Sequence, residues 1–248
     1  MEKKCTPLIT PKKLRGNKIL PNFLDGCSDV IIGFCSFKDE VLKKLNILEK
    51  PIVSHLDDKH QFWGEFNGKR FLAFDMAYGG VIISSLLEEL KELYGIKRAF
   101  GYGYAGSLNP QINIGDIIFA SRTLNINGVS KEYYPNDKYF YASESLINKY
   151  HEIAKSFDIR YKTATAWTTE AIYREYPEDI ERWIDLGSEI VNMEVSSFYA
   201  VCKKVKIETG YICSISDSLI DSSWDENFVN ARSLNKQLFD ISLNCLLA

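Results

Sequence analysis

The sequence predicts an α/β protein with a mostly parallel sheet, and two observations support this prediction. Short apolar runs rich in β-branched residues alternate with longer segments whose apolar residues recur at helical spacing, the order typical of parallel strands joined by crossover helices. The chain has 248 residues, of which 46% are hydrophobic and 25% charged, which is enough for one large domain with a full core. Neither a repeat nor a linker divides it, so we expect one domain over residues 29–248.

The first 28 residues are expected to form an extended arm, because they contain Pro7, Pro11 and Pro21 with basic residues between them. Such an arm either contacts another subunit or packs loosely. The first strand is Asp29-Val-Ile-Ile-Gly33, and the first helix is expected over 39–45. Residues 62–74 are expected to form a hairpin whose two-residue turn is Asn67-Gly68.

The following elements are expected from their periodicity and end signals. A helix over 81–94 ends at Gly95, and residues 98–100 form a strand that enters a glycine-rich loop. A further strand covers 116–120, and an amphipathic helix over 143–157 begins at Ser143 as its cap. Further helices are expected over 179–185, 198–205 and 233–247, and a buried strand over 209–215.

Composition excludes several classes of protein. The net charge is −3 and the chain has no dense Lys/Arg block, so we expect no nucleic-acid partner. It has no run of about 18 apolar residues, so we expect no membrane span. The N-terminus lacks the apolar segment of a signal peptide, and the six cysteines form no Cys-x-x-Cys pair, so a cytoplasmic protein with buried thiols is expected. Three dispersed histidines predict no metal site, and no cofactor is expected.

Two acidic residues stand at positions where ligands bind in α/β proteins. Glu194 opens the helix that precedes the strand 209–215, and Asp217 follows the carboxyl end of that strand. In open α/β sheets, ligands bind at the carboxyl ends of strands. Position alone leaves two interpretations of Asp217, a catalytic acid or a helix N-cap.

The segment Gly101-Tyr-Gly-Tyr-Ala-Gly106 has the spacing of the dinucleotide-binding fingerprint and follows a strand. That fingerprint must open a helix whose N-terminus receives a pyrophosphate. Here Pro110 and Gly115 follow, and they make a continuous helix implausible. We therefore interpret the segment as a glycine loop that lets a ligand approach the backbone closely.

Five segments occur in an order that resembles the nucleoside phosphorylase superfamily, and the resemblance covers roughly residues 29–245. They are Gly103-Tyr-Ala-Gly-Ser-Leu-Asn-Pro with Ile114-Gly-Asp-Ile-Ile118, Gly128-Val-Ser-Lys-Glu-Tyr-Tyr-Pro135, Trp167-Thr-Thr-Glu-Ala-Ile-Tyr-Arg-Glu175, Val191-Asn-Met-Glu-Val195 and Ile215-Ser-Asp-Ser-Leu219. The resemblance implies a single-domain three-layer α/β/α sandwich around a mixed, mostly parallel sheet. It also implies cleavage of an N-glycosidic bond and assembly into a homo-oligomer, as a dimer, trimer or hexamer.

The resemblance assigns roles to residues of this chain. Met193 and Glu194 match a pair that binds the ribose, and a carboxylate suits this because it accepts hydrogen bonds from two hydroxyls. The alternative for Glu194 is a surface acid in the first turn of a helix. Asp217 matches the aspartate that protonates or hydrogen-bonds the purine N7, which favours a purine substrate. Base-binding positions fall on Ile172, Tyr173 and Asn192, with core packing as the alternative for Ile172. Trp167 is expected in the core.

The positions that bind phosphate in phosphorylases differ in this chain. The resemblance places an anion or anomeric-centre loop at Gly33, Gly103, Tyr104, Ala105 and Gly106, but the arginines of phosphorylases are missing and Tyr104 stands where phosphate needs space. Nucleosidases of the superfamily lack those arginines and use water. Glu40 matches their catalytic base, with an ordinary exposed glutamate as the alternative.

The sequence thus predicts cleavage of a nucleoside, with a purine favoured and with phosphate and water both open as acceptor. A nucleoside-binding or storage protein that kept the pocket and lost turnover is the alternative.

Overall fold

The computed structural model describes residues 7–160, 162–220 and 223–247. The described strands are β1 Asp29–Gly33, β2 Asn46–Ile47, β3 Gln61–Phe66, β4 Lys69–Phe74, β5 Arg98–Ser107, β6 Ile117–Leu124, β7 Tyr139–Tyr141, β8 Thr163–Thr168, β9 Ile190–Asn192, β10 Glu208–Ser218 and β11 Asp225–Glu226. The α-helices are α1 Pro11–Arg15, α2 Asp39–Leu42, α3 Gly79–Tyr94, α4 Gly128–Tyr133, α5 Glu144–Ser156, α6 Pro177–Asp185, α7 Val195–Val205, α8 Phe228–Ser233 and α9 Asn235–Leu247. Short 3₁₀ turns are η1 Asn22–Leu24, η2 Asp58–His60 and η3 Ile172–Arg174.

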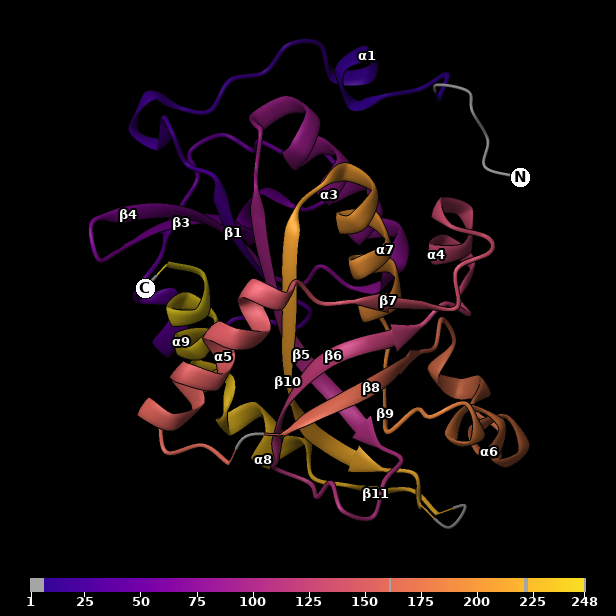
Figure 1. Cartoon of the computed structure of the whole chain (residues 1–248). Helices are drawn as coiled ribbons and strands as arrows, with labels where there is room; N and C mark the ends of the chain where they lie inside the picture. The colour runs from indigo at the N-terminus through magenta and orange to yellow at the C-terminus, as the bar shows by residue number, and fades with distance from the viewer. Residues whose placement is uncertain (1–6, 161, 221–222, 248) are drawn as a thin grey trace.

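The strands form a mixed sheet in the order β11-β10-β6-β8-β9-β5-β1-β4-β3-β2, with β7 added beside β6. Because β10 also pairs with β5, the strands β10, β6, β8, β9 and β5 close on themselves. Parallel pairings join β4, β1, β5 and β10 in the middle of the sheet and join β8 to β6 and β9. The pairs β3–β4, β5–β9 and β6–β10 are antiparallel, as are the pairings of the short strands β2, β7 and β11. The long strands β5 and β10 lie side by side through the centre of the molecule (Figure 1).

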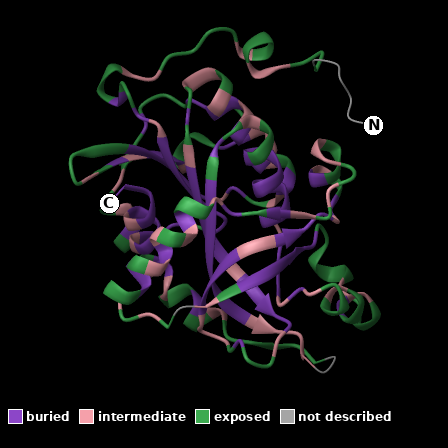
Figure 2. Cartoon of the chain, viewed as in Figure 1, coloured by how far each residue is buried: buried purple, intermediate pink, exposed green. Residues whose placement is uncertain are grey.

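Helices cover the sheet on two sides, as the expected layered α/β fold requires (Figure 1). On one side α3, α4 and α7 pack together, and on the other side α5, α8 and α2 pack against α9. Buried residues follow the strands and the inner faces of these helices, while the outer faces are exposed (Figure 2). Residues 195–202 of α7 are buried, and its charged residues Lys203 and Lys204 lie exposed in the last turn.

Most of the expected elements are present. The hairpin 62–74 is formed by β3 and β4, and both turn residues, Asn67 and Gly68, have positive φ. Helix α3 ends at Gly95 in the left-handed conformation, as expected. Helix α2 is shorter than expected. The expected helix over 233–247 is present as α9, which begins two residues later than expected and is preceded by the separate short helix α8. Ser143 occupies the cap position of α5, but its hydroxyl accepts a bond from the Thr209 N–H instead of capping the helix.

The expected glycine loop over 101–106 was wrong, because these residues continue strand β5 as far as Ser107. The glycines have a packing role there. A Cβ on Gly103 would lie 3.2 Å from the Phe34 Cβ and 3.1 Å from the Tyr211 hydroxyl, so the absent side chain leaves room for these aromatic residues. No helix opens after the segment, which agrees with the rejection of a dinucleotide fingerprint.

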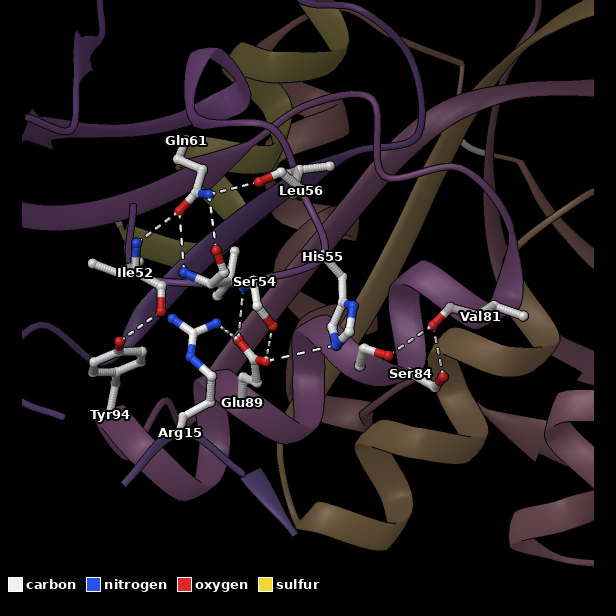
Figure 3. A network of polar contacts seen from close by, with 12 residues as sticks. Arg15, Ile52, Ser54, His55, Leu56, Gln61, Val81, Ser84, Glu89 and Tyr94 are labelled. Carbon is white, nitrogen blue, oxygen red and sulfur yellow. Dashed lines mark hydrogen bonds and ion pairs between the residues drawn. The ribbon is translucent and has the colours of Figure 1, made fainter. Parts of the chain in front are cut away.

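The arm before β1 is tied to α3 through a polar network around Glu89 (Figure 3). The buried Glu89 carboxylate accepts a hydrogen bond from the Ser54 amide at 3.0 Å and lies 3.4 Å from the Arg15 guanidinium. It also accepts the Ser54 hydroxyl and lies 3.8 Å from His55 Nε2. Thr10 bonds Glu92 on the same helix. The arm is therefore tied to α3 at Thr10 and Arg15, although the α1 helix within it has no buried residue.

Among the described residues, no helix combines the length and apolarity that a membrane crossing requires. The described part of the chain also contains no group of three or more potential metal ligands. Five cysteines are buried free thiols, whereas Cys5 lies outside the described residues.

Candidate active site

A cavity of about 450 Å³ opens at the carboxyl ends of β5, β9 and β10. Three residues in register form its floor, because Gly106 on β5 pairs with Val191 on β9 and with Asp217 on β10. Two strand spacings separate Val191 from Asp217, roughly 10 Å. A Cβ on Gly106 would lie 3.1 Å from an Asp217 oxygen, so a glycine here lets the carboxylate lie close to β5. The cavity is lined by Phe34, Tyr78, Tyr104, Ala105, Gly106, Thr169, Ile172, Tyr173, Glu175, Val191, Asn192, Met193, Glu194, Ser216, Asp217, Leu219, Trp224 and Phe228.

Glu194 lines this cavity as the residue that precedes α7. Only 5% of it is exposed, so it is not a surface acid. Its two carboxylate oxygens accept backbone N–H groups, from Gly79 at 3.1 Å and from Met193 at 3.2 Å. Burial raises the pKa of Glu194 to about 7, against the opposing effect of these two donors. The carboxylate is thus held in place while part of its hydrogen-bonding capacity remains available to a ligand.

Asp217 lines the same cavity near the end of β10, within the strand and not beyond it as expected. A bulge between Ile215 and Asp217 interrupts the pairing with β5 and re-aims the side chain. Its oxygens accept the Ser216 hydroxyl at 2.6 Å and the Trp224 indole N–H at 3.1 Å. Asp217 lies in β10 and caps none of the helices within the described residues, so the N-cap interpretation is not supported there. Glu194 and Asp217 therefore share one cavity, although they lie 23 positions apart in the sequence.

The expected base-binding residues also line the cavity. Ile172 and Tyr173 are 51% and 91% exposed, so they lie at its rim and core packing does not explain them. Asn192 is buried at the end of β9, where its carbonyl accepts the Thr168 hydroxyl at 2.9 Å and the Glu194 amide at 3.1 Å. Its Nδ2 is buried and has no hydrogen-bond partner among the described residues. A buried donor of this kind is suited to an acceptor on a bound ligand. Trp167 packs in a small buried cluster, as expected.

The structure divides the expected anion loop. Tyr104, Ala105 and Gly106 line the cavity, whereas Gly33 lies against Phe37 and Gly103 against Phe34, and neither lines it. The Tyr104 hydroxyl accepts the Asn235 side-chain N–H at 3.4 Å, and burial raises its pKa. A neutral phenol therefore occupies the place where an anion was considered.

Glu40 is not brought to the cavity. It is exposed on α2, which packs against α9, and it does not line the cavity. Its charge acts on Lys236 of α9, which is exposed on the outer side of that helix.

Several lining residues were not identified from the sequence, above all Glu175, Ser216 and Trp224. Ser216 and Trp224 hold Asp217, and Glu175 brings a further carboxyl group to the cavity. Glu175 follows Ile172 and Tyr173 by two or three positions. This closeness to two expected base-binding residues was the signal in the sequence that could have identified it.

The sequence model of the phosphorylase superfamily matches residues 30–244. The chain is 29% identical to uncharacterized protein R802 of Acanthamoeba polyphaga mimivirus, over 97% of this chain and 96% of that protein. It is 31% identical to the DeoD-type purine nucleoside phosphorylase of Caldanaerobacter subterraneus subsp. tengcongensis, over 71% of this chain and 76% of that protein.

Two solved structures have the same fold. Purine nucleoside phosphorylase from Toxoplasma gondii, in complex with immucillin-H, superposes with a TM-score of 0.74 and 20% identity over 89% of this chain and 90% of its own. Campylobacter jejuni 5'-methylthioadenosine/S-adenosyl homocysteine nucleosidase superposes with a TM-score of 0.71 and 17% identity over 89% of this chain and 99% of its own.

Proposed function

The chain belongs to the phosphorylase superfamily, and from this premise we propose that it cleaves the N-glycosidic bond of a purine nucleoside. The observation that carries the proposal is the single cavity shared by Glu194 and Asp217. Glu194 accepts hydrogen bonds from the ribose hydroxyls, and Met193 packs beside the sugar. Asp217 faces the base, where a proton or hydrogen bond at N7 stabilises the charge that the leaving purine gains.

The chemistry of the cavity favours these roles. As the C1'–N9 bond breaks, the ribose becomes oxocarbenium-like and the base takes the bonding electron pair. A nearby carboxylate stabilises the positive charge on the sugar. Ser216 and Trp224 fix the position of the Asp217 carboxylate with hydrogen bonds of 2.6 and 3.1 Å. A purine therefore meets an oriented group and not a mobile one.

Water is favoured over phosphate as the acceptor. Among the described residues that line the cavity, none is Lys or Arg, and a phosphate dianion depends on such partners. Tyr104 further reduces the space next to β5. The observation that favours phosphate is Arg232 on α8, whose guanidinium lies 5.9 Å from the ring centre of Phe228, a lining residue.

A second candidate function is nucleoside binding without turnover. It is favoured by the position of Glu40, which leaves the cavity without the base that a superfamily nucleosidase would use on water. Cleavage and binding without turnover both require the same hydrogen bonds to the ribose, so a binding measurement alone does not distinguish these two functions.

The purified protein should release free base from purine nucleosides in the absence of phosphate. The assay incubates it with inosine, guanosine, adenosine, methylthioadenosine and uridine, with and without phosphate, and follows base release by chromatography. Asp217→Asn should lower kcat by about 10²- to 10⁴-fold with little change in nucleoside affinity. Asp225→Asn, an exposed acid on the neighbouring strand, is the matched control.

Each outcome of this assay separates the alternatives. Release that requires phosphate makes the protein a phosphorylase, and tight binding without release supports the binding protein. Equal turnover by the Asp217→Asn variant would remove Asp217 from the mechanism.

A further inference from the structure

His60 and Asp75 form a close pair that the mechanism above does not use. The His60 Nδ1 lies 2.6 Å from an oxygen of the Asp75 carboxylate. The Asp75 side chain is buried, whereas 21% of the His60 side chain is exposed. Because an ionised carboxylate only accepts hydrogen bonds, the His60 Nδ1–H is the donor. Neither residue is among the described residues that line the cavity, so an effect of this pair on a bound ligand must pass through the residues it holds.

The Asp75 carboxylate joins three segments that are separated in the sequence. Asp75 follows β4, and its second oxygen accepts the Phe37 amide, in the loop after β1, at 2.8 Å. His60 ends η2 directly before β3, and its carbonyl accepts the Asp75 amide at 3.3 Å. The loop after β1, the start of β3 and the segment between β4 and α3 are therefore held together at this carboxylate.

The segment between β4 and α3 forms part of the cavity wall beside Glu194. Tyr78 lines the cavity, and the next residue, Gly79, donates its amide to a Glu194 oxygen at 3.1 Å. The backbone of this segment is strained, since Met76 has a φ of 57°, which is uncommon for a residue other than glycine. Such a conformation persists only where the surrounding structure holds it. Asp75, the residue before Met76, supplies a contact of this kind.

The loop after β1 reaches the cavity through Phe34, which is one of its lining residues. Its Cys35 carbonyl accepts the Met76 amide at 3.2 Å, next to the bond from the Phe37 amide to Asp75. The strained residue thus lies between two contacts, one from this loop and one through the carboxylate that His60 also contacts.

We propose that the His60–Asp75 pair positions the sugar end of the cavity, by holding the segment that supplies Tyr78 and the Gly79 amide. This inference rests on the proposed function, in which Glu194 binds the ribose. Without the imidazole donor, the buried Asp75 carboxylate keeps only one of the two hydrogen bonds described above and turns toward another partner. The segment that follows it then relaxes, and the Gly79 amide no longer fixes the Glu194 carboxylate.

The base end of the cavity does not depend on this pair. Asp217 lies on β10 and is held by the Ser216 hydroxyl and the Trp224 indole N–H. Loss of the His60 donor should therefore weaken the binding of the ribose and leave the binding of the free base unchanged. General destabilisation of the protein would not distinguish these two ligands.

The test compares two substitutions of similar size at position 60. In His60→Asn the side-chain N–H takes the place of the Nδ1–H, whereas in His60→Gln the amide lies near the place of Nε2 and the donor to Asp75 is lost. The ligands are adenosine with adenine, and inosine with hypoxanthine. The measured quantities are kcat/KM for the nucleosides, or their dissociation constants by calorimetry if they are not cleaved, and the dissociation constants of the bases.

His60→Gln should lower kcat/KM or the affinity for the nucleoside about tenfold and should bind the free base within about twofold of the wild type. His60→Asn should stay within about threefold of the wild type for both ligands. His55→Ala is the matched control, because His55 lies 3.8 Å from another buried carboxylate, that of Glu89, and does not contact the segment beside Glu194 (Figure 3). It should leave both ligands unchanged.

Equal losses for nucleoside and base in His60→Gln, or no loss for either, would overturn the assignment of the pair. The same holds if His60→Asn loses as much nucleoside affinity as His60→Gln, because the Nδ1 donor would then not be the group that acts. If the wild type neither cleaves nor binds a nucleoside, the proposed function fails. If the wild type cleaves or binds nucleosides and the two variants do not differ, only the role of the His60–Asp75 pair fails.

Discussion

Two buried glutamates, Glu89 on α3 and Glu194 before α7, are exposed by only 3% and 5% but have different surroundings. Glu89 accepts both the amide and the hydroxyl of Ser54, and the Arg15 guanidinium lies 3.4 Å away (Figure 3). Glu194 has two backbone donors and faces a cavity. The Glu89 carboxylate is paired with a cation inside the protein, whereas the Glu194 carboxylate can accept further hydrogen bonds from a ligand.

This difference indicates how a fold assigns structural and functional roles to the same residue type. A buried charge that is paired with a cation and several donors fixes the elements that supply them. A buried charge without a cation destabilises the unliganded protein, and such groups persist at sites where a ligand interacts with them. The two glutamates should therefore respond to the same substitution in opposite ways.

Glu194→Gln should cause the largest change in activity. An amide accepts the ribose hydroxyls less strongly and turns a donor toward the sugar, so kcat/KM should fall about 100-fold or more. Base release by chromatography, or nucleoside affinity by calorimetry, measures the loss. A variant with activity within a few-fold of the wild type would show that Glu194 does not bind the ribose.

The stability of the same variant should differ from the wild type in its pH dependence. The pKa of Glu194 is raised from 4.5 to about 7, so the folded state binds more protons than the unfolded state between these values. Stability from this group is fully present below pH 4.5 and is lost as the pH rises through 7, by about 3 kcal/mol. Glu194→Gln removes this loss, so it should gain stability relative to the wild type from pH 5 to pH 8. Urea denaturation of the wild type and of Glu194→Gln at pH 5 and at pH 8 tests this expectation. The same pH dependence of the unfolding free energy in both proteins would contradict it.

Glu89→Gln should show the opposite behaviour. Its amide cannot accept all the donors that surround Glu89, and Arg15 loses its counter-charge, so the free energy of unfolding should fall by about 2–4 kcal/mol. Activity per folded molecule should stay within about twofold of the wild type, since Glu89 does not line the cavity. Denaturation midpoints and base release on the same preparation measure both quantities. A loss of activity without a loss of stability would place Glu89 in the functional site.

Much of this arrangement could be predicted from local patterns, and the parts that could not depend on tertiary contacts. Glu194 and Asp217 follow from rules on helix starts and strand ends, which act over a few residues. The glycines at 101–106 resemble a loop in sequence, but Phe34, which packs against two of them, comes from far earlier in the chain. The bulge that re-aims Asp217 and the donor Trp224 likewise depend on neighbouring strands.

Glu40 shows the converse limit. Its position near the start of the first helix matches a motif, but α2 packs against α9 and leaves Glu40 exposed outside the cavity. Glu175 was missed because nothing local distinguishes it from the exposed acids of α6. Only the folded chain brings it to the cavity that Asp217 also lines.

Arg15→Ala should have the smallest effect of the changes considered. The Arg15 side chain is 20% exposed and Ser54 continues to donate to Glu89, so the loss should be about 1 kcal/mol or less. The effect should disappear in a Glu89→Gln background, because Arg15 acts on stability through that carboxylate. Denaturation of the two single variants and the double variant gives the coupling energy. A loss as large as that of Glu89→Gln would mean that the arm, and not the Ser54 donors, holds the carboxylate in place.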